Sequence, residues 1–104
     1  MDRVEKLKEL LRDSPDDSFL QHALALEYIK TGEEWPARRL FEELLAKDPS
    51  YVGSYYHLGK LLERMHETAL ALGWYEKGMA AAKAVGNRHA FSELEAAYED
   101  LSEG

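Results

Sequence analysis

This chain of 104 residues predicts an all-α protein built from antiparallel helix hairpins. Apolar residues recur with a helical period of about 3.6 residues in six segments, most of which end at a proline, a glycine or another helix-stop signal. No segment shows the alternation typical of a β-strand, and no connection is longer than a few residues. Because short connections make neighbouring helices antiparallel, we expect about six helices that form successive hairpins.

The N-terminal half predicts three helices. The first covers residues 1–13 and stops at Ser14-Pro15, the second runs from a capping group at residues 16–18 to Gly32, and the third has Pro36 in its first turn. Their apolar stripes are Val4, Leu7, Leu10 and Leu11, then Phe19, Leu20, Ala23, Leu24 and Tyr28, and then Leu40, Phe41, Leu44 and Leu45. The third helix is expected to end at Asp48-Pro49.

The C-terminal half repeats this cycle. A fourth helix is expected over residues 51–64 and a fifth over residues 67–85, before the stop signal Gly86-Asn87. A sixth helix over residues 88–101 places four apolar side chains on one face, namely Phe91, Leu94, Tyr98 and Leu101.

The chain contains an internal repeat of 34 residues. Pro15 and Pro49 are separated by this length, and each stands between one helix and the capping group of the next. Two repeats therefore cover residues 18–51 and 52–85. Small residues recur where the helices of a hairpin must approach closely, at Ala25 and Gly59, at Ala37 and Ala71, and at Gly78.

These repeats resemble the tetratricopeptide repeat, whose pattern contains an aromatic residue, Leu-Gly, Tyr, Ala, a second aromatic residue and a closing Pro. The matching residues are Leu24, Ala25, Tyr28, Ala37 and Phe41 in the first repeat, and Tyr55, Leu58, Gly59, Ala71 and Tyr75 in the second. Gln21, Leu62 and Lys83 depart from the pattern. The resemblance implies a right-handed superhelical stack of hairpins, an α-α solenoid, that forms a single domain over residues 1–104. Two flanking helices complete it, one within residues 1–15 and a capping helix at 88–101, where Leu94 and Tyr98 keep the family spacing and Glu95 replaces a small residue.

The family resemblance also implies a binding surface. In such proteins the first helices of successive repeats line a concave groove, and the family positions fall on Phe19, His22, Ala23, Leu26, Ile29 and Lys30, and on Gly53, Tyr56, His57, Lys60, Glu63 and Arg64. Our candidate peptide-binding residues are nine of these: Phe19, His22, Leu26, Ile29, Lys30, Tyr56, His57, Lys60 and Arg64. The expected groove is apolar at one end and net positive at the other.

We therefore expect an interaction scaffold that binds a protein or peptide segment, with Lys30, Lys60 and Arg64 meeting an acidic segment or a terminal carboxylate. Two plainer interpretations remain open, namely that the cations are ordinary surface charges and that the apolar residues are buried against a flanking helix. An alternative function is self-association into a homodimer through the same exposed face. Some chaperone-binding members of the family clamp a carboxylate with Lys and Asn, but the matching places hold His22, Leu26 and His57, so we do not expect that clamp.

Composition argues against several other classes of protein. The net charge of −7 is spread through both halves, which disfavours nucleic acid as a partner, and no apolar stretch is long enough for a membrane helix. The absence of cysteine excludes disulfides and thiol chemistry and favours a cytoplasmic location. His66-Glu67 begins like a zinc signature, but Leu70 stands where the second His should be. We expect no cofactor, no metal site and no enzyme activity.

Overall fold

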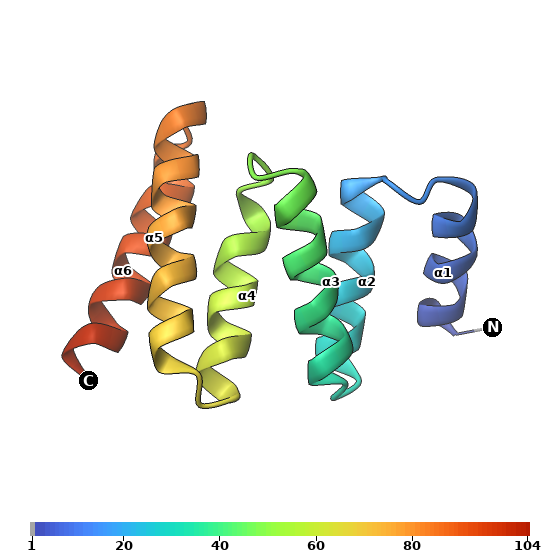
Figure 1. Cartoon of the computed structure of the whole chain (residues 1–104), viewed down its shortest axis with the longest axis horizontal. Coiled ribbons are helices and arrows are strands. Elements are labelled where there is room, and N and C mark those ends of the chain that lie inside the picture. Colours follow the sequence, from blue (N-terminus) through green and yellow to red (C-terminus); the bar gives the residue numbers. More distant parts are fainter. Residues whose placement is uncertain (1) are drawn as a thin grey trace. The chain divides into compact units, whose positions relative to one another are not determined.

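A computed structural model of the protein describes residues 2–104, in which six helices and no strand are found (Figure 1). The helices are α1 (Arg3–Asp13), α2 (Ser18–Lys30), α3 (Glu34–Lys47), α4 (Gly53–Arg64), α5 (Thr68–Val85) and α6 (Arg88–Glu103). They form two compact units, the first ending at Asp48 and the second covering Pro49–Gly104. The all-α class is confirmed, and the expected helices lie within a few residues of the observed ones. The expected first helix included Met1, which lies outside the described residues.

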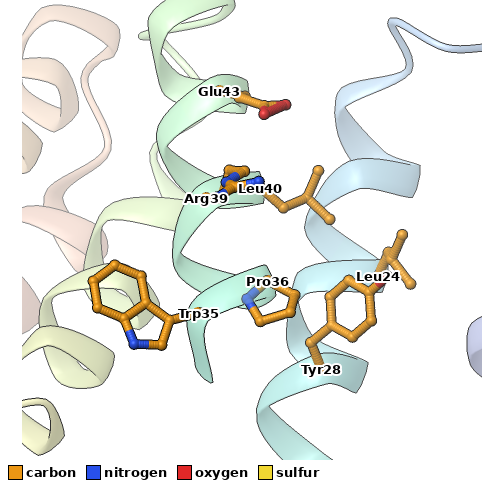
Figure 2. Close-up of a pocket in the computed structure, with 7 residues that line it drawn as sticks. All are labelled: Leu24, Tyr28, Trp35, Pro36, Arg39, Leu40 and Glu43. Atoms are coloured by element: carbon orange, nitrogen blue, oxygen red, sulfur yellow. The ribbon is translucent and has the colours of Figure 1, made fainter. Parts of the chain in front are cut away.

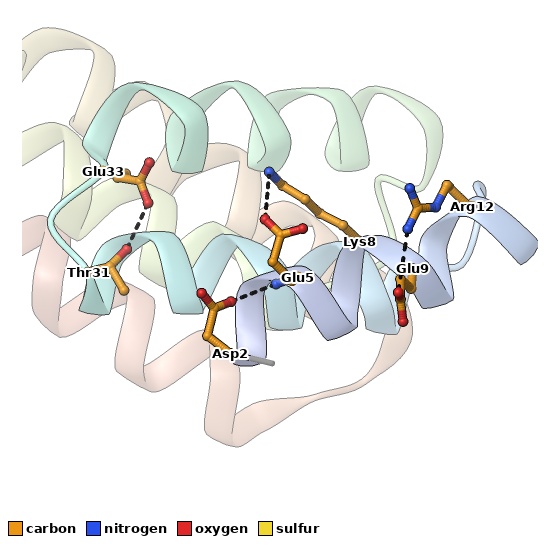
Figure 3. Close-up of polar contacts among 7 residues, drawn as sticks. All are labelled: Asp2, Glu5, Lys8, Glu9, Arg12, Thr31 and Glu33. Carbon is orange, nitrogen blue, oxygen red and sulfur yellow. Dashed lines mark hydrogen bonds and ion pairs between the residues drawn. The ribbon is translucent and has the colours of Figure 1, made fainter.

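In the first unit, α1 is a capped amphipathic helix with a polar outer side. The Asp2 side chain accepts a hydrogen bond of 2.9 Å from the Glu5 amide at the helix N-terminus. Ion pairs within the helix join Lys8 to Glu5 and Arg12 to Glu9, at 3.8 and 3.9 Å (Figure 3). Such exposed pairs contribute little to stability. Between α1 and α2, Leu7 is buried and Nε of Arg3 lies 2.9 Å from the Glu27 carboxylate, so an apolar and an ionic contact both position α1.

The apolar stripe of α1 is narrower than expected. Leu7 is buried, whereas Leu10 keeps 44% of its surface exposed. Within its unit α1 contacts α2 and not α3, so only one side of the helix is covered. At about 100° per residue, Leu7 and Leu11 lie within about 60° of Val4 around the helix axis, whereas Leu10 lies about 120° away from it. Leu10 thus belongs to the apolar stripe of the sequence but lies at its exposed edge.

The hairpin of α2 and α3 supplies the core of the first unit. Asp17 caps α2 by accepting from the Leu20 amide at 3.1 Å, and Gly32 turns the chain with a positive φ of 82°. The two helices bury apolar side chains against each other in the stripe that the sequence predicts: Leu24 and Ala25 from α2, and Ala37, Phe41, Leu44 and Leu45 from α3. Pro36 lies in the first turn of α3, where a missing N–H costs no helical hydrogen bond.

In the second unit, α4, α5 and α6 contact one another. The small residues lie where the helices come closest, since a Cβ on Gly59 would overlap Tyr75 and a Cβ on Gly78 would lie 2.6 Å from Cβ of Tyr55. Gly86 ends α5 in the left-handed conformation, and Asn87 caps α6 by accepting from the Ala90 amide at 3.0 Å. The close helix approach inferred from these glycines is confirmed.

One departure from the repeat pattern preserves a structural role. In the second repeat the Tyr55 hydroxyl donates to the Pro49 carbonyl at 2.6 Å. In the first repeat Gln21 occupies the corresponding position, and its Nε2 donates to the Pro15 carbonyl at 3.2 Å. Each first helix is thus tied to the turn that precedes it, although the two side chains differ in chemistry.

Candidate functional site

On α2, the predicted residues form a face that ranges from half-buried to exposed. Phe19 keeps 67% of its surface exposed at the start of the helix, and Lys30 is exposed at its end. Between them, His22, Leu26 and Ile29 are half-buried. The His22 ring packs edge-on against Phe41 of α3 with centroids 5.7 Å apart, so part of this side chain belongs to the hairpin contact. Phe19 is therefore the most accessible apolar group of the predicted face.

On α4, three of the predicted residues lie against one another. The Tyr56 and His57 rings are nearly perpendicular with centroids 5.7 Å apart, and Nζ of Lys60 lies 5.7 Å from the Tyr56 ring centroid. Arg64, at the end of the helix, is exposed. These three residues therefore form an aromatic and basic cluster on α4 that is half-buried rather than fully solvated.

The positive charge of α4 is smaller than the sequence suggested. The Glu63 carboxylate lies 3.7 Å from the Lys60 ammonium, and it also accepts a short hydrogen bond from the Tyr75 hydroxyl of α5. Burial, together with this hydrogen bond and the charge of Glu63, raises the pKa of Tyr75 above its ordinary value. Glu63 therefore couples the candidate face to the core of its unit and partly neutralises Lys60.

A residue that the sequence analysis did not select also acts on this surface. Burial lowers the pKa of His57 below its ordinary value of 6.5, and the negative charge of Glu93 on α6 opposes that shift. The signal for Glu93 was present in the repeat register, because α6 matches the pattern of a first helix and contacts α4. Glu93 thus belongs with the α4 face, and its charge opposes the net positive end that we expected.

A pocket of about 320 Å³ between α2 and α3 was also missed (Figure 2). Its walls are Leu24 and Tyr28 from α2 and Trp35, Pro36, Arg39, Leu40 and Glu43 from α3. Trp35 keeps 64% of its surface exposed, and the Arg38 guanidinium lies 4.8 Å from its ring centroid. A tryptophan in the first turn of a helix was the only sequence signal for this site.

Within residues 2–104, none of the helices combines the length and the apolarity needed to cross a membrane. The same residues contain no group of three or more His, Asp or Glu side chains that could hold a metal ion.

Comparisons with known proteins agree with the helical hairpin arrangement. No protein-family model matches the chain. A TPR repeat-containing protein of Pseudomonas aeruginosa is 26% identical over 91 residues, which are 88% of this chain and 87% of the relative. The crystal structure of a tetratricopeptide repeat domain protein from Salinibacter ruber is 42% identical with a TM-score of 0.80, and the match covers 84% of this chain and 97% of that one.

A more distant structure shares the fold. The TPR2B domain of yeast Sti1, solved as a complex with pHsp70, matches with a TM-score of 0.88 at 21% identity, over 96% of this chain and 80% of that one. The similarity to the Salinibacter ruber protein is high enough, and extends over enough of both chains, to establish kinship. This protein therefore belongs to the tetratricopeptide repeat family.

Proposed function

We propose that this protein is an interaction scaffold that binds a segment of a protein partner on the outer faces of its first helices, α2 and α4. The observation that carries the proposal is the exposure of Phe19, which keeps 67% of its surface accessible on a helix whose opposite face is buried. A large exposed aromatic side chain on the same helix as half-buried Leu26 and Ile29 is typical of a protein-binding surface. Extended or helical segments commonly dock on such helix-lined faces.

The chemistry of the two faces differs, which favours a partner segment of mixed character. On α2 the apolar set would bind apolar side chains. On α4 a partner carboxylate would compete with Glu63 for Lys60, and it would also meet Arg64. Because Lys60 is already partly neutralised, we assign most of the affinity to the apolar contacts, and to the cations an effect mainly on association rate and selectivity.

The relatives support this proposal at the level of the fold. The TPR2B domain of yeast Sti1 forms a complex with pHsp70, so an arrangement of helices like this one can present a partner-binding surface. His22, Leu26 and His57 replace the clamp residues of chaperone-binding family members, and we therefore propose a segment that is not held by a carboxylate clamp. We further propose that the partner segment is acidic.

Phe19→Ser is the primary test. Partners would be captured from a lysate of the native organism, identified, and titrated against purified variants. We expect Phe19→Ser to weaken binding by at least about tenfold, as removal of an exposed aromatic anchor commonly does. Trp35→Ser is the matched control, because Trp35 is equally exposed at 64% but lies on α3. Loss of binding in the control alone would place the site at the pocket between α2 and α3 and contradict the proposal.

The electrostatic part is tested separately by Lys60→Glu with Arg64→Glu. We expect slower association and a weaker dependence on salt, since two attractive charges become repulsive toward an acidic segment. A variant with Arg39→Glu and Lys77→Glu makes the same change of charge on α3 and α5 and should bind normally. If both double variants bind equally well, an acidic partner segment is contradicted. The proposed apolar contact on α2 would not be affected by that result.

Self-association through the same faces is the competing function. Light scattering after size-exclusion chromatography would detect it, and Phe19→Ser would then abolish the dimer instead of the binding of a partner. A dimer that dissociates on addition of the captured partner would fit our proposal, whereas a tight dimer that excludes the partner would not.

A further inference from the structure

The N-terminal half of α6 has an apolar face that no helix of its unit covers. Phe91 is half-buried and lines a cavity of about 390 Å³, together with Ala82 and Lys83 of α5. Leu94 takes the place of Leu24 and Leu58 in the family pattern, and counted from it Phe91 corresponds to Gln21 and Tyr55. Those two residues are covered by the second helix of their hairpin, Gln21 through a hydrogen bond from Lys47 and Tyr55 through contact with Gly78.

A second uncovered face lies on α1. Leu10 keeps 44% of its surface exposed, and within its unit α1 contacts only α2. Leu10 precedes Leu44 by one repeat length and Gly78 by two. Leu44 is fully buried, and Gly78 faces Tyr55 of the first helix in its hairpin as well as Leu94 of the next helix, so this position normally packs against the first helix of its own hairpin on one side. The exposed side of α1 is thus the side that the second helix of a repeat packs against its first helix. The exposed side of α6 is the side that the first helix of a repeat packs against its second helix.

We propose that α1 of a second copy of this chain docks antiparallel on α6, so that Leu10 of the second copy packs on Phe91 and the two helices form a hairpin between molecules. This assembly goes beyond the proposed partner binding, and it uses none of the candidate residues on α2 and α4.

Charge complementarity supports this occupant and this orientation. Antiparallel docking brings Lys6 at the start of α1 to the end of α6, where Glu95 and Glu99 are exposed. Arg3 comes to the same place, and although it pairs with Glu27 of α2 at 2.9 Å, its side chain stays 67% exposed. Reversing the direction of α1 would instead place these cations near Lys83 at the end of α5 and Arg88 at the start of α6, which are both exposed.

The opposite end of the contact is complementary as well. Asp13 precedes Lys47 by one repeat length, and Lys47 reaches from its helix to Gln21 and to the Asp16 carbonyl. The same geometry would bring Asp13 of the second copy to the cavity wall formed by Lys83 and Arg88. Opposite charges therefore meet at both ends, with an apolar pair between them.

The proposed contact is heterologous, because each copy offers two different faces. One α1 face and one α6 face per molecule allow further copies to add, so the assembly grows into a ring or an open chain instead of stopping at a symmetric dimer. The mean mass should therefore rise steadily with protein concentration.

Sedimentation equilibrium over a series of concentrations tests the proposal with three variants. Leu10→Glu blocks the α1 face, and Glu95→Lys with Glu99→Lys blocks the α6 face. Leu70→Glu is the matched control, since Leu70 on α5 is 43% exposed. We expect each blocking variant to weaken association at least about tenfold and the control to behave as wild type. Circular dichroism checks that every variant keeps its helices, which is expected because all substituted side chains are exposed.

Mixing the two blocking variants gives the sharper result. Each retains one intact face, so an equimolar mixture should form a 1:1 dimer although neither variant associates alone. A wild type that stays monomeric up to millimolar concentration, equal effects of Leu10→Glu and Leu70→Glu, or a mixture that remains monomeric would each overturn the proposal. An α6-blocked variant that still dimerises by itself would show a symmetric α1 contact, which also overturns it.

Discussion

Gly59 of α4 packs directly against the ring of Tyr75 on α5, and the contact leaves no space for a side chain at position 59. A Cβ placed on Gly59 would lie 2.1 Å from Cε1 of Tyr75, far closer than two carbon atoms approach in proteins. Tyr75 is fully buried and donates its hydroxyl hydrogen to Glu63, which holds the ring in place. The absence of a side chain at Gly59 therefore determines how closely the hairpin of the second repeat can pack.

Gly59→Ala should destabilise the protein despite the better helix propensity of alanine. Propensity alone would favour alanine by about 1 kcal/mol, but the buried ring cannot move without loss of its packing and its hydrogen bond. We expect a net loss of about 1 to 3 kcal/mol in the free energy of unfolding, measured in urea. A Tyr75→Leu background should reduce the penalty, because the clashing ring is then absent.

Gly73→Ala is the opposite case on the same hairpin. Gly73 lies within α5, and a Cβ there would meet no atom within 4 Å. Only the helix propensity changes, so we expect a gain of up to about 1 kcal/mol in the same urea experiment. A loss of stability in Gly73→Ala would mean that the free space around a glycine does not determine whether alanine is tolerated there.

Tyr55→Phe should destabilise the second unit through the loss of a single hydrogen bond. The Tyr55 hydroxyl donates to the Pro49 carbonyl at 2.6 Å, and the ring itself stays buried in the variant. We expect a cost of about 0.5 to 1.5 kcal/mol in the free energy of unfolding. Amide hydrogen exchange should rise mainly in the first turn of α4, and an unchanged exchange pattern there would contradict the anchoring role.

The stability of the protein should fall with rising pH above about 10 in a way that depends on Tyr75. The folded state raises the pKa of this hydroxyl above its ordinary value of 10.0, through burial first and then through Glu63. The folded protein therefore holds the proton more tightly than the unfolded chain, and the resulting stability is present below pH 10 and is lost above it. Tyr75→Phe should show a shallower decline than wild type in urea melts between pH 9 and 11.

His57 should titrate below 6.5 in the folded protein, because burial lowers its pKa. The unfolded chain then binds the proton more tightly, so the contribution of His57 to stability is present above pH 6.5 and is lost as pH falls. Glu93 raises this pKa, and Glu93→Gln should therefore lower it further. Titration of the His57 ring signals by NMR measures both values, and an unchanged pKa in Glu93→Gln would separate α6 from the α4 face.

The amino-acid sequence by itself determined the elements and their pairing. A helical period, helix-stop signals and short connections depend on residues close in sequence, so the six helices and their hairpins could be predicted. The 34-residue repeat also identified the small residues, and Ala25, Ala37 and Ala71 are fully buried as expected. The assignment of Phe19, His22, Leu26 and Ile29 to one face of a single helix came instead from the resemblance to the tetratricopeptide repeat.

Only the tertiary structure decided how that surface is charged and which apolar residues stay exposed. The coupling of Glu63 to Tyr75, the effect of Glu93 on His57 and the pocket beside Trp35 all join residues from different helices. Leu10 belongs to an apolar stripe in the sequence, yet it is exposed because α1 is covered on one side only. The physical reason is that periodicity specifies the direction of a side chain around its own helix, whereas burial and electrostatics depend on which neighbouring helix fills the space that it faces.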